Sequence, residues 1–94
     1  MPAEITTVER TVSIGSRVGL HARPAAAVVE LAGTLPAVVA IHRGDRVAAD
    51  ARSLLSLIAL GAEQGDEVTL RAEGDGAEQA VSALADLIAS DQDA

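Results

Sequence analysis

The fold is decided by residues 19–26, which read Gly19-Leu20-His21-Ala22-Arg23-Pro24-Ala25-Ala26. Gly19 permits a turn with positive φ that other residues resist. Pro24 suits the first turn of a helix, where its missing N–H does no harm. Apolar residues then recur at helical spacing, at positions 25, 28, 29 and 32. We therefore expect a helix that begins at about His21 and ends near Gly33, a residue typical of helix ends.

The predicted helix start brings His21 and Arg23 together with backbone N–H groups that have no partner inside the helix. Such a helix N-terminus attracts anions, and the planar guanidinium of Arg23 suits phosphate oxygens. A histidine with an ordinary pKa of about 6.5 is partly neutral near pH 7, so its ring is nucleophilic. These groups predict a site that accepts a phosphoryl group on His21. The alternative is that His21 is only a helix cap or a loop residue.

The stretch from Gly19 to Ala25 resembles the active-site motif of HPr, the histidine-containing phosphocarrier family of the bacterial sugar phosphotransferase system. The resemblance implies that His21 is phosphorylated on Nδ1 and that Arg23 assists. Many members carry Thr or Ser directly after the histidine, and Ala22 lacks this hydroxyl. Arg17, in the preceding loop, is a further candidate for contact with the phosphoryl group or a partner. The alternative is that Arg17 is a solvated loop arginine.

The remaining sequence predicts four strands and three helices in the order βαββαβα. Alternation of polar and apolar residues, or enrichment in β-branched ones, predicts strands over about 8–14, 37–43, 46–50 and 67–73. A hairpin signal, Gly44-Asp45, joins the middle two strands. Helical spacing predicts further helices over about 53–60 and 77–90, and residues 91–94 are expected to be a frayed tail.

One apolar face on each strand and one apolar stripe on each helix favour an α+β domain of two layers. We expect a four-stranded antiparallel sheet with the three helices packed on one face, and we expect residues 1–94 to form one such domain. The HPr resemblance extends over about residues 8–88 and implies this same open-faced β-sandwich. Periodicity alone does not predict the order of the strands in the sheet.

The predicted second helix begins at Ser53, a preferred capping residue, and Gly61 stops it. The segment Arg52-Ser53-Leu54-Leu55 resembles the regulatory serine segment of the HPr family, which a dedicated HPr kinase or phosphorylase modifies in some bacteria. The resemblance implies that Ser53 is a phosphorylation site whose added negative charge acts on a docking surface. The alternative is that Ser53 is only a helix cap.

This second helix carries more apolar residues than one buried face requires. They are Leu54, Leu55, Leu57, Ile58 and Leu60. We expect Leu54 and Leu55 to be exposed and the other three to include the core positions. An exposed apolar patch usually marks a binding surface, and in the HPr family this patch lies beside the active histidine and docks partners. The expected partner-binding residues are Leu20, Arg17, Leu54 and Leu55.

Composition excludes several classes of function. Seven arginines, no lysine and fourteen acidic residues give a formal net charge of −7, and the chain has no Phe, Tyr or Trp. Nucleic acids require basic patches and stacking platforms, so we expect no nucleic-acid partner. No segment approaches the roughly 18 apolar residues of a membrane span, and the start lacks the pattern of a secretory signal. Cysteine is absent, which fits a reducing compartment, and we expect a cytoplasmic protein.

The function predicted from these observations is that of a phosphoryl carrier and not of an enzyme. The HPr resemblance implies that enzyme I, charged from phosphoenolpyruvate, donates to His21 and that an enzyme IIA domain accepts. We expect no metal or organic cofactor, because His42 has no second His or Cys nearby and no other ligand cluster occurs. A monomer is expected, since a small carrier must exchange between partners.

Three alternatives remain open. A nitrogen-regulatory paralogue would keep the histidine chemistry and serve other partners. A regulatory module would act through Ser53 alone, but such a module would not need His21 and Arg23. A hydrolytic enzyme would use His21 as a base and require a second catalytic group, for which Asp50 is the one candidate acid near either motif.

Overall fold

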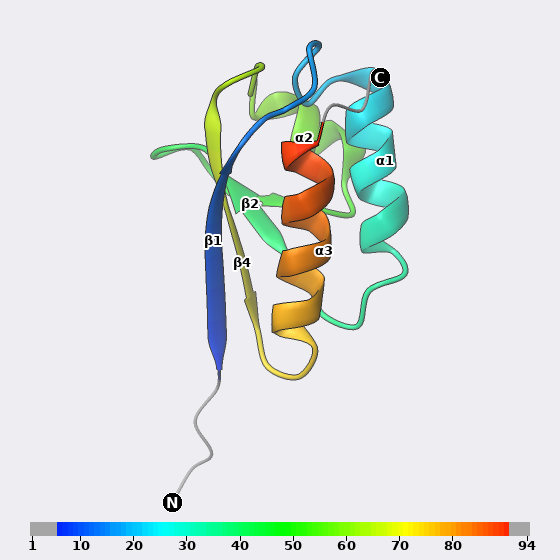
Figure 1. Ribbon diagram of the computed structural model, residues 1–94, viewed down its shortest axis with the longest axis vertical. Coiled ribbons are helices and arrows are strands. Elements are labelled where there is room, and N and C mark those ends of the chain that lie inside the picture. Colours follow the sequence, from blue (N-terminus) through cyan, green and yellow to red (C-terminus); the bar gives the residue numbers. More distant parts are fainter. Residues whose placement is uncertain (1–5, 91–94) are drawn as a thin grey trace, which may run out of the picture.

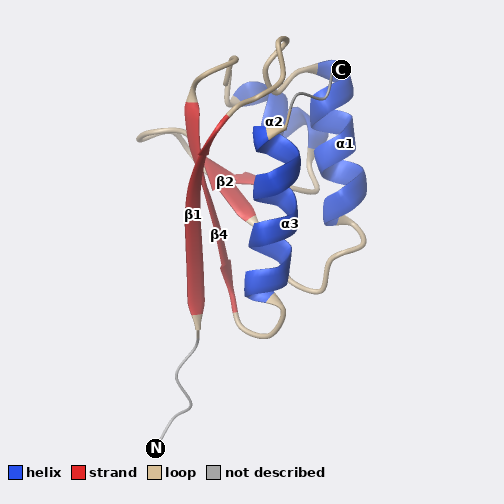
Figure 2. Cartoon of the chain, in the orientation of Figure 1, coloured by secondary structure: helices blue, strands red, loops and turns tan. Residues whose placement is uncertain are grey.

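The computed structural model describes residues 6–90, so the expected frayed tail at 91–94 lies outside the described residues. The elements follow the predicted order: β1 (Thr7–Ser13), α1 (Ala22–Ala32), β2 (Ala40–His42), β3 (Ala49–Asp50), α2 (Leu54–Ala59), β4 (Glu67–Glu73) and α3 (Ala77–Ala89). The sheet forms one layer and the three helices lie on one side of it (Figures 1 and 2). This arrangement confirms the predicted α+β open-faced sandwich.

The sheet has the strand order β1-β4-β2-β3, and all of its pairings are antiparallel. β1 pairs with β4 along its whole length, and Ser13 at the end of β1 lies opposite Glu67 at the start of β4. β2 pairs with the middle of β4, and β3 forms the far edge. Because β1 ends where β4 begins, the loop after β1 and the turn before β4 are brought together, although they are distant in sequence.

β4 shows the period of two that its sequence predicts, and its bounds equal the predicted range. Val68, Leu70 and Ala72 are buried, while the residues between them are more exposed. Alternate side chains of a strand point to opposite faces of a sheet. The buried set therefore defines the face of β4 on which the helices pack.

α3 packs over β1 and β4 (Figure 2). The predicted inner residues of α3 are buried or half-buried, and they are Ala80, Val81, Leu84, Leu87 and Ile88. The core is built from aliphatic side chains, since the sequence has no aromatic residue. Its stability therefore depends on close aliphatic packing, in which a buried leucine replaced by alanine costs about 2–5 kcal/mol.

β2 and β3 are shorter than the sequence predicts. The predicted ranges 37–43 and 46–50 contract to Ala40–His42 and Ala49–Asp50. Val38 and Val47 are β-branched, but no strand pairs with them and their side chains are 53% and 90% exposed. β-branched composition favours extended backbone, but it does not supply the neighbouring strand that a ladder requires.

The start of α1, the loop after β1 and α2 lie at the same end of the molecule (Figure 1). α1 packs against both α2 and α3. This end of the fold therefore brings together the two sequence motifs, the one around His21 and the one around Ser53.

Candidate functional site

His21 is the N-cap residue of α1, with φ −119° and ψ 161°. Its carbonyl oxygen accepts a hydrogen bond from Ala25 N at 3.3 Å, but its side chain makes no capping bond. The imidazole is half-buried and has no hydrogen-bond or ion-pair partner among residues 6–90. The predicted helix start is thus confirmed, and α1 ends as expected with Gly33 as its C-cap.

Arg23 lies in the first turn of α1, two residues after His21, and its side chain is exposed. Within the described part of the chain Arg23 forms no ion pair. Other arginines do form ion pairs, with carboxylates 3.1–3.4 Å away, among them Arg10–Asp86, Arg43–Asp66, Arg52–Asp50 and Arg71–Glu73. The Arg23 guanidinium is therefore exposed and without an ion pair within residues 6–90, two residues after His21 in the chain.

The loop before His21 is fixed by Gly19 and Leu20. Gly19 has φ +68°, which confirms the predicted turn, and Leu20 N donates to the carbonyl oxygen of Ala62 at 2.9 Å. Leu20 is only 1% exposed and belongs to the core. The prediction that Leu20 contacts a partner is therefore wrong. The side chain points inward and anchors the loop that leads to His21.

Ala22, between His21 and Arg23, has φ +38°, and among residues 6–90 no other residue except glycine has positive φ. A left-handed backbone brings Cβ close to the following carbonyl, at a cost of roughly 1–2 kcal/mol. The backbone is therefore strained at the residue that joins the two motif side chains. Nothing in the sequence indicates this strain, because alanine does not favour a conformation with positive φ.

Ser16 shapes the middle of the same loop and was not singled out from the sequence. Gly19 N donates to Ser16 O at 3.1 Å, and Val18 N donates to Ser16 Oγ at 3.3 Å. These bonds close a turn over residues 16–19 while the Ser16 side chain is fully buried. Arg17 and Val18 are the exposed residues of this turn, and with Glu63 and Gln64 they line a shallow hollow.

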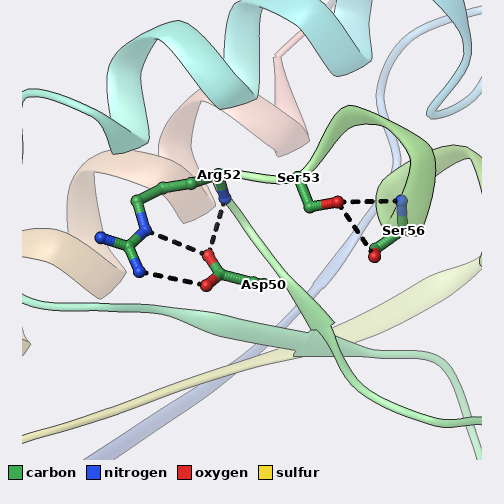
Figure 3. A network of polar contacts seen from close by, with 4 residues as sticks. All are labelled: Asp50, Arg52, Ser53 and Ser56. Atoms are coloured by element: carbon green, nitrogen blue, oxygen red, sulfur yellow. Dashed lines mark hydrogen bonds and ion pairs between the residues drawn. The ribbon is translucent and has the colours of Figure 1, made fainter.

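Ser53 caps α2, as its sequence position predicts (Figure 3). Its Oγ accepts a hydrogen bond from Ser56 N at 3.3 Å and lies 3.0 Å from Ser56 Oγ, to which it donates. The Ser53 side chain is half-buried, and the Ser56 side chain is exposed. The hydroxyl of Ser53 is therefore engaged in the cap without being fully covered.

The apolar residues of α2 divide between core and surface as predicted. Leu57 and Leu60 are buried, and Ile58 is half-buried against the core. Leu54 and Leu55 are 42% and 83% exposed. We call these two leucines the α2 patch.

Asp50 and Arg52 form a closed pair just before Ser53 (Figure 3). Asp50 Oδ1 accepts from Arg52 N at 2.9 Å and from Arg52 Nε at 3.3 Å, and Oδ2 accepts from Nη2 at 3.1 Å. These hydrogen bonds lower the pKa of Asp50 and raise the pKa of Arg52. Within residues 6–90 the Asp50 carboxylate forms its side-chain contacts with Arg52 and none with His21.

The described residues contain no group of three or more His, Cys, Asp or Glu side chains that would hold a metal ion. His42 lies in β2 opposite Thr69 of β4 and is half-buried. None of the helices in residues 6–90 has the length and apolar character needed to cross a membrane.

Comparisons with known proteins bear on this site directly. A family model described as "PTS HPr component phosphorylation site" matches residues 8–90. The phosphocarrier protein HPr of Streptomyces coelicolor is 41% identical over 81 residues, which are 86% of this chain and 87% of that protein. The phosphocarrier protein NPr of Proteus mirabilis is 33% identical over 84 residues, 89% of this chain and 93% of that protein. The crystal structure of a phosphocarrier protein HPr from Bacillus anthracis matches with a TM-score of 0.81 at 33% identity, covering 87% of this chain and 96% of that one.

The fold, the histidine motif and these matches define a phosphoryl carrier of the phosphotransferase system. The chain belongs to the HPr family.

Proposed function

We propose that His21 is the residue that carries the phosphoryl group, on its Nδ1 atom, and that Arg23 holds the phosphoryl oxygens. The observation that supports this proposal most is the position of an imidazole without a partner among residues 6–90 at the N-terminus of α1. The free N–H groups of this first turn and the Arg23 guanidinium supply positive charge. The first turn contains no acidic residue that would repel a phosphoryl group.

The transfer step uses the groups of this chain without a cofactor. The lone pair of Nδ1 in neutral His21 attacks phosphorus, and the N–P bond forms as the bond to the donor atom breaks. The electron pair of that broken bond stays on the donor. A phosphoramidate is a high-energy linkage, so a histidine of the next protein takes the group without further energy input. The protein then acts as a carrier and not as an enzyme.

The partners that fit this role are enzyme I as donor and an enzyme IIA domain as acceptor, in the sugar branch of the system. The α2 patch and Arg17 are the residues proposed to contact them, because they are exposed and lie on segments at the end of the fold where α1 begins. We further infer one domain over residues 1–94, working as a monomer in the cytoplasm. A single core cluster with members from all three helices supports one domain, and the absence of cysteine fits a reducing compartment.

The nitrogen branch is the second candidate, because a relative named NPr is 33% identical over nearly the same span. The two branches share the histidine chemistry and differ in the acceptor. Phosphorylated protein should be offered in parallel to a sugar-specific IIA domain and to a nitrogen-branch IIA domain. Faster transfer to the sugar-specific domain supports the proposal, and faster transfer to the other domain assigns the chain to the nitrogen branch.

Ser53 is proposed as a regulatory phosphorylation site, because its half-exposed hydroxyl directly precedes the α2 patch. A phosphate adds about two negative charges there and would weaken docking of an apolar partner surface. Incubation with an HPr kinase and ATP should add one acid-stable phosphate. Ser53→Ala should abolish this phosphate, while Ser56→Ala should retain it. Labelling of Ser53→Ala would place the modification elsewhere.

The carrier proposal is tested by intact-mass measurement after incubation with phosphoenolpyruvate and enzyme I. One acid-labile phosphoryl group should appear on the wild-type chain, and none on His21→Ala. A His42→Ala variant is the matched control, because it removes the other histidine of the chain and should be phosphorylated normally. Phosphorylation of His21→Ala would show that another residue is the acceptor.

A further inference from the structure

Arg43, the residue directly after β2, joins two other segments of the fold. Its Nη1 donates to the carbonyl oxygens of Leu60, at 3.3 Å, and Gly61, at 3.2 Å, at the C-terminal end of α2. Its Nη2 lies 3.2 Å from Asp66 Oδ2, and the Arg43 and Asp66 side chains are 32% and 34% exposed. The guanidinium spans these acceptors because its N–H donors form a rigid planar fork.

The turn that Arg43 holds, residues 61–66, is closed by Asp66 itself. Asp66 Oδ2 accepts a hydrogen bond from Glu63 N at 2.9 Å. The same turn receives the end of β1, because Ile14 N donates to Asp66 O at 2.9 Å and Gly65 N donates to Ile14 O at 2.9 Å. The 61–66 turn therefore contacts Arg43 on one side and Ile14, the residue after β1, on the other.

The 61–66 turn also holds the residue before His21. Leu20 N donates to Ala62 O at 2.9 Å, and Gly19 packs against Ala62 and Glu63 without room for a side chain. The loop that ends at His21 is thus hydrogen-bonded to the 61–66 turn, which follows α2 directly in the chain. Arg43 braces this junction, because its guanidinium contacts Leu60 O, Gly61 O and Asp66 Oδ2 together.

We propose that Arg43 is a positioning residue for phosphoryl transfer, which keeps His21 and the α2 patch in one fixed arrangement. The proposal rests on the proposed function, in which a partner binds the patch and reaches His21 at the same time. A partner docked on the patch loses its alignment with His21 when the two move apart. A misplacement of about 1 Å at a reacting atom is enough to slow a transfer by about a hundredfold. His21 and Arg23 share the first turn of α1, so their mutual arrangement does not depend on Arg43.

The test compares Arg43→Ala and Arg43→Lys with Arg46→Ala. Arg43→Lys keeps the positive charge and one donor group, so its rate of phosphoryl transfer should lie between those of Arg43→Ala and wild type. Arg46 lies in the same β2–β3 connection, is exposed and has no ion pair in the described part of the chain, so Arg46→Ala removes the same charge without removing the contacts. Each variant is offered phosphorylated enzyme I and, separately, potassium phosphoramidate, a small donor that needs no docking surface.

We expect Arg43→Ala to slow transfer from enzyme I at least about tenfold while leaving the rate with phosphoramidate within about twofold of wild type. Arg46→Ala should match wild type with both donors. Equal slowing with both donors, or no slowing with enzyme I, would overturn the positioning role.

Amide hydrogen exchange supplies a readout that needs no partner protein. In Arg43→Ala the amides of Leu20 and Gly65 should exchange at least about tenfold faster, whereas the amide of Leu84 in α3 should be nearly unchanged. Unchanged exchange at Leu20 and Gly65 would refute the proposal even if transfer fell. If wild type accepts no phosphoryl group from enzyme I, the proposed function fails, and the exchange result still decides whether Arg43 fastens the loop.

Discussion

Gly19 and Ala62 approach so closely that a Cβ on Gly19 would lie 2.4 Å from the carbonyl oxygen of Ala62. Gly19 also has φ +68°, which disfavours any L side chain. Gly19→Ala should therefore lower the free energy of unfolding by about 2 kcal/mol or more, as measured by urea denaturation followed by circular dichroism. Gly44→Ala is the control, because Gly44 has φ +55° with no atom within 4 Å of the added Cβ. It should cost only about 1 kcal/mol, and an equal loss in both variants would show that the close approach to Ala62 is not limiting.

The strain at Ala22 predicts a substitution that stabilises the protein. Ala22 has φ +38°, a conformation that glycine adopts readily, so Ala22→Gly should raise the free energy of unfolding by up to about 1 kcal/mol. Ala26→Gly, at an exposed position in the same helix, should lower it by about 1 kcal/mol. Urea denaturation of both variants should therefore give changes in the free energy of unfolding of opposite sign. A loss of stability in Ala22→Gly would mean that Ala22 is not strained in solution.

Arg23→Ala should slow phosphoryl transfer and leave the fold intact. The Arg23 side chain is exposed and forms no ion pair among residues 6–90, so its loss should change the free energy of unfolding by less than about 0.5 kcal/mol. The rate of transfer from enzyme I should fall at least about tenfold, because a donor to the phosphoryl oxygens is removed. Rapid-quench kinetics would measure the rate, with Arg46→Ala as the charge-matched comparison. Unchanged kinetics would remove Arg23 from the mechanism.

The two faces of α2 should respond differently to the same substitution. Leu57 is fully buried and Leu55 is 83% exposed. Leu57→Ala should cost about 2–5 kcal/mol of stability, whereas Leu55→Ala should cost less than about 0.5 kcal/mol. If the α2 patch docks partners, Leu55→Ala should raise the KM for this protein in the enzyme I reaction. A KM equal to that of wild type would exclude Leu55 from the interface.

The pair of Asp50 and Arg52 predicts a dependence of stability on pH. Hydrogen bonds from Arg52 lower the pKa of Asp50 below its ordinary value of 3.8. A carboxylate with a lowered pKa stabilises the folded state above its unfolded pKa, and this contribution is lost as pH falls through the folded pKa. The melting temperature of wild type should therefore exceed that of Asp50→Asn near pH 7, and the difference should shrink as the pH falls below the ordinary pKa of 3.8 and through the lowered pKa of the folded state. The effect should be small because both side chains are largely exposed, and a difference independent of pH would argue against the pair.

The sequence predicted the elements whose local pattern agrees with their surroundings. β4 alternates strictly and was placed to the residue, and Ser53 caps α2 as its position indicated. The start of α1 was also predicted, because a helix that contains Pro24 accommodates it best in its first turn. Strand order was not predictable, since the pairing of β4 with β1 and β2 depends on contacts between distant segments.

The errors have the same physical origin. Leu20 was expected at a docking surface beside His21, but Leu20 is buried in the core, and its N–H donates to the carbonyl oxygen of Ala62. No sequence pattern distinguishes Ser16 and Arg43, because their roles depend on hydrogen bonds within the loop and to residues at the end of α2. The His21 imidazole and the Arg23 guanidinium could be identified from one short motif, whereas the residues that hold this motif in place are spread along the chain.

The fastening of the His21 loop to the 61–66 turn has a consequence for the order of folding. The three hydrogen bonds at Ile14 and Leu20 join residues more than about forty positions apart, and closing so long a segment carries an entropic cost that must be met before the contacts form. Local helices such as α1 can form early, but the loop gains these hydrogen bonds only when the 61–66 turn is present. A nascent chain that ends before this turn therefore already contains the whole histidine motif, yet it lacks the hydrogen-bond partners that hold the motif in the folded protein.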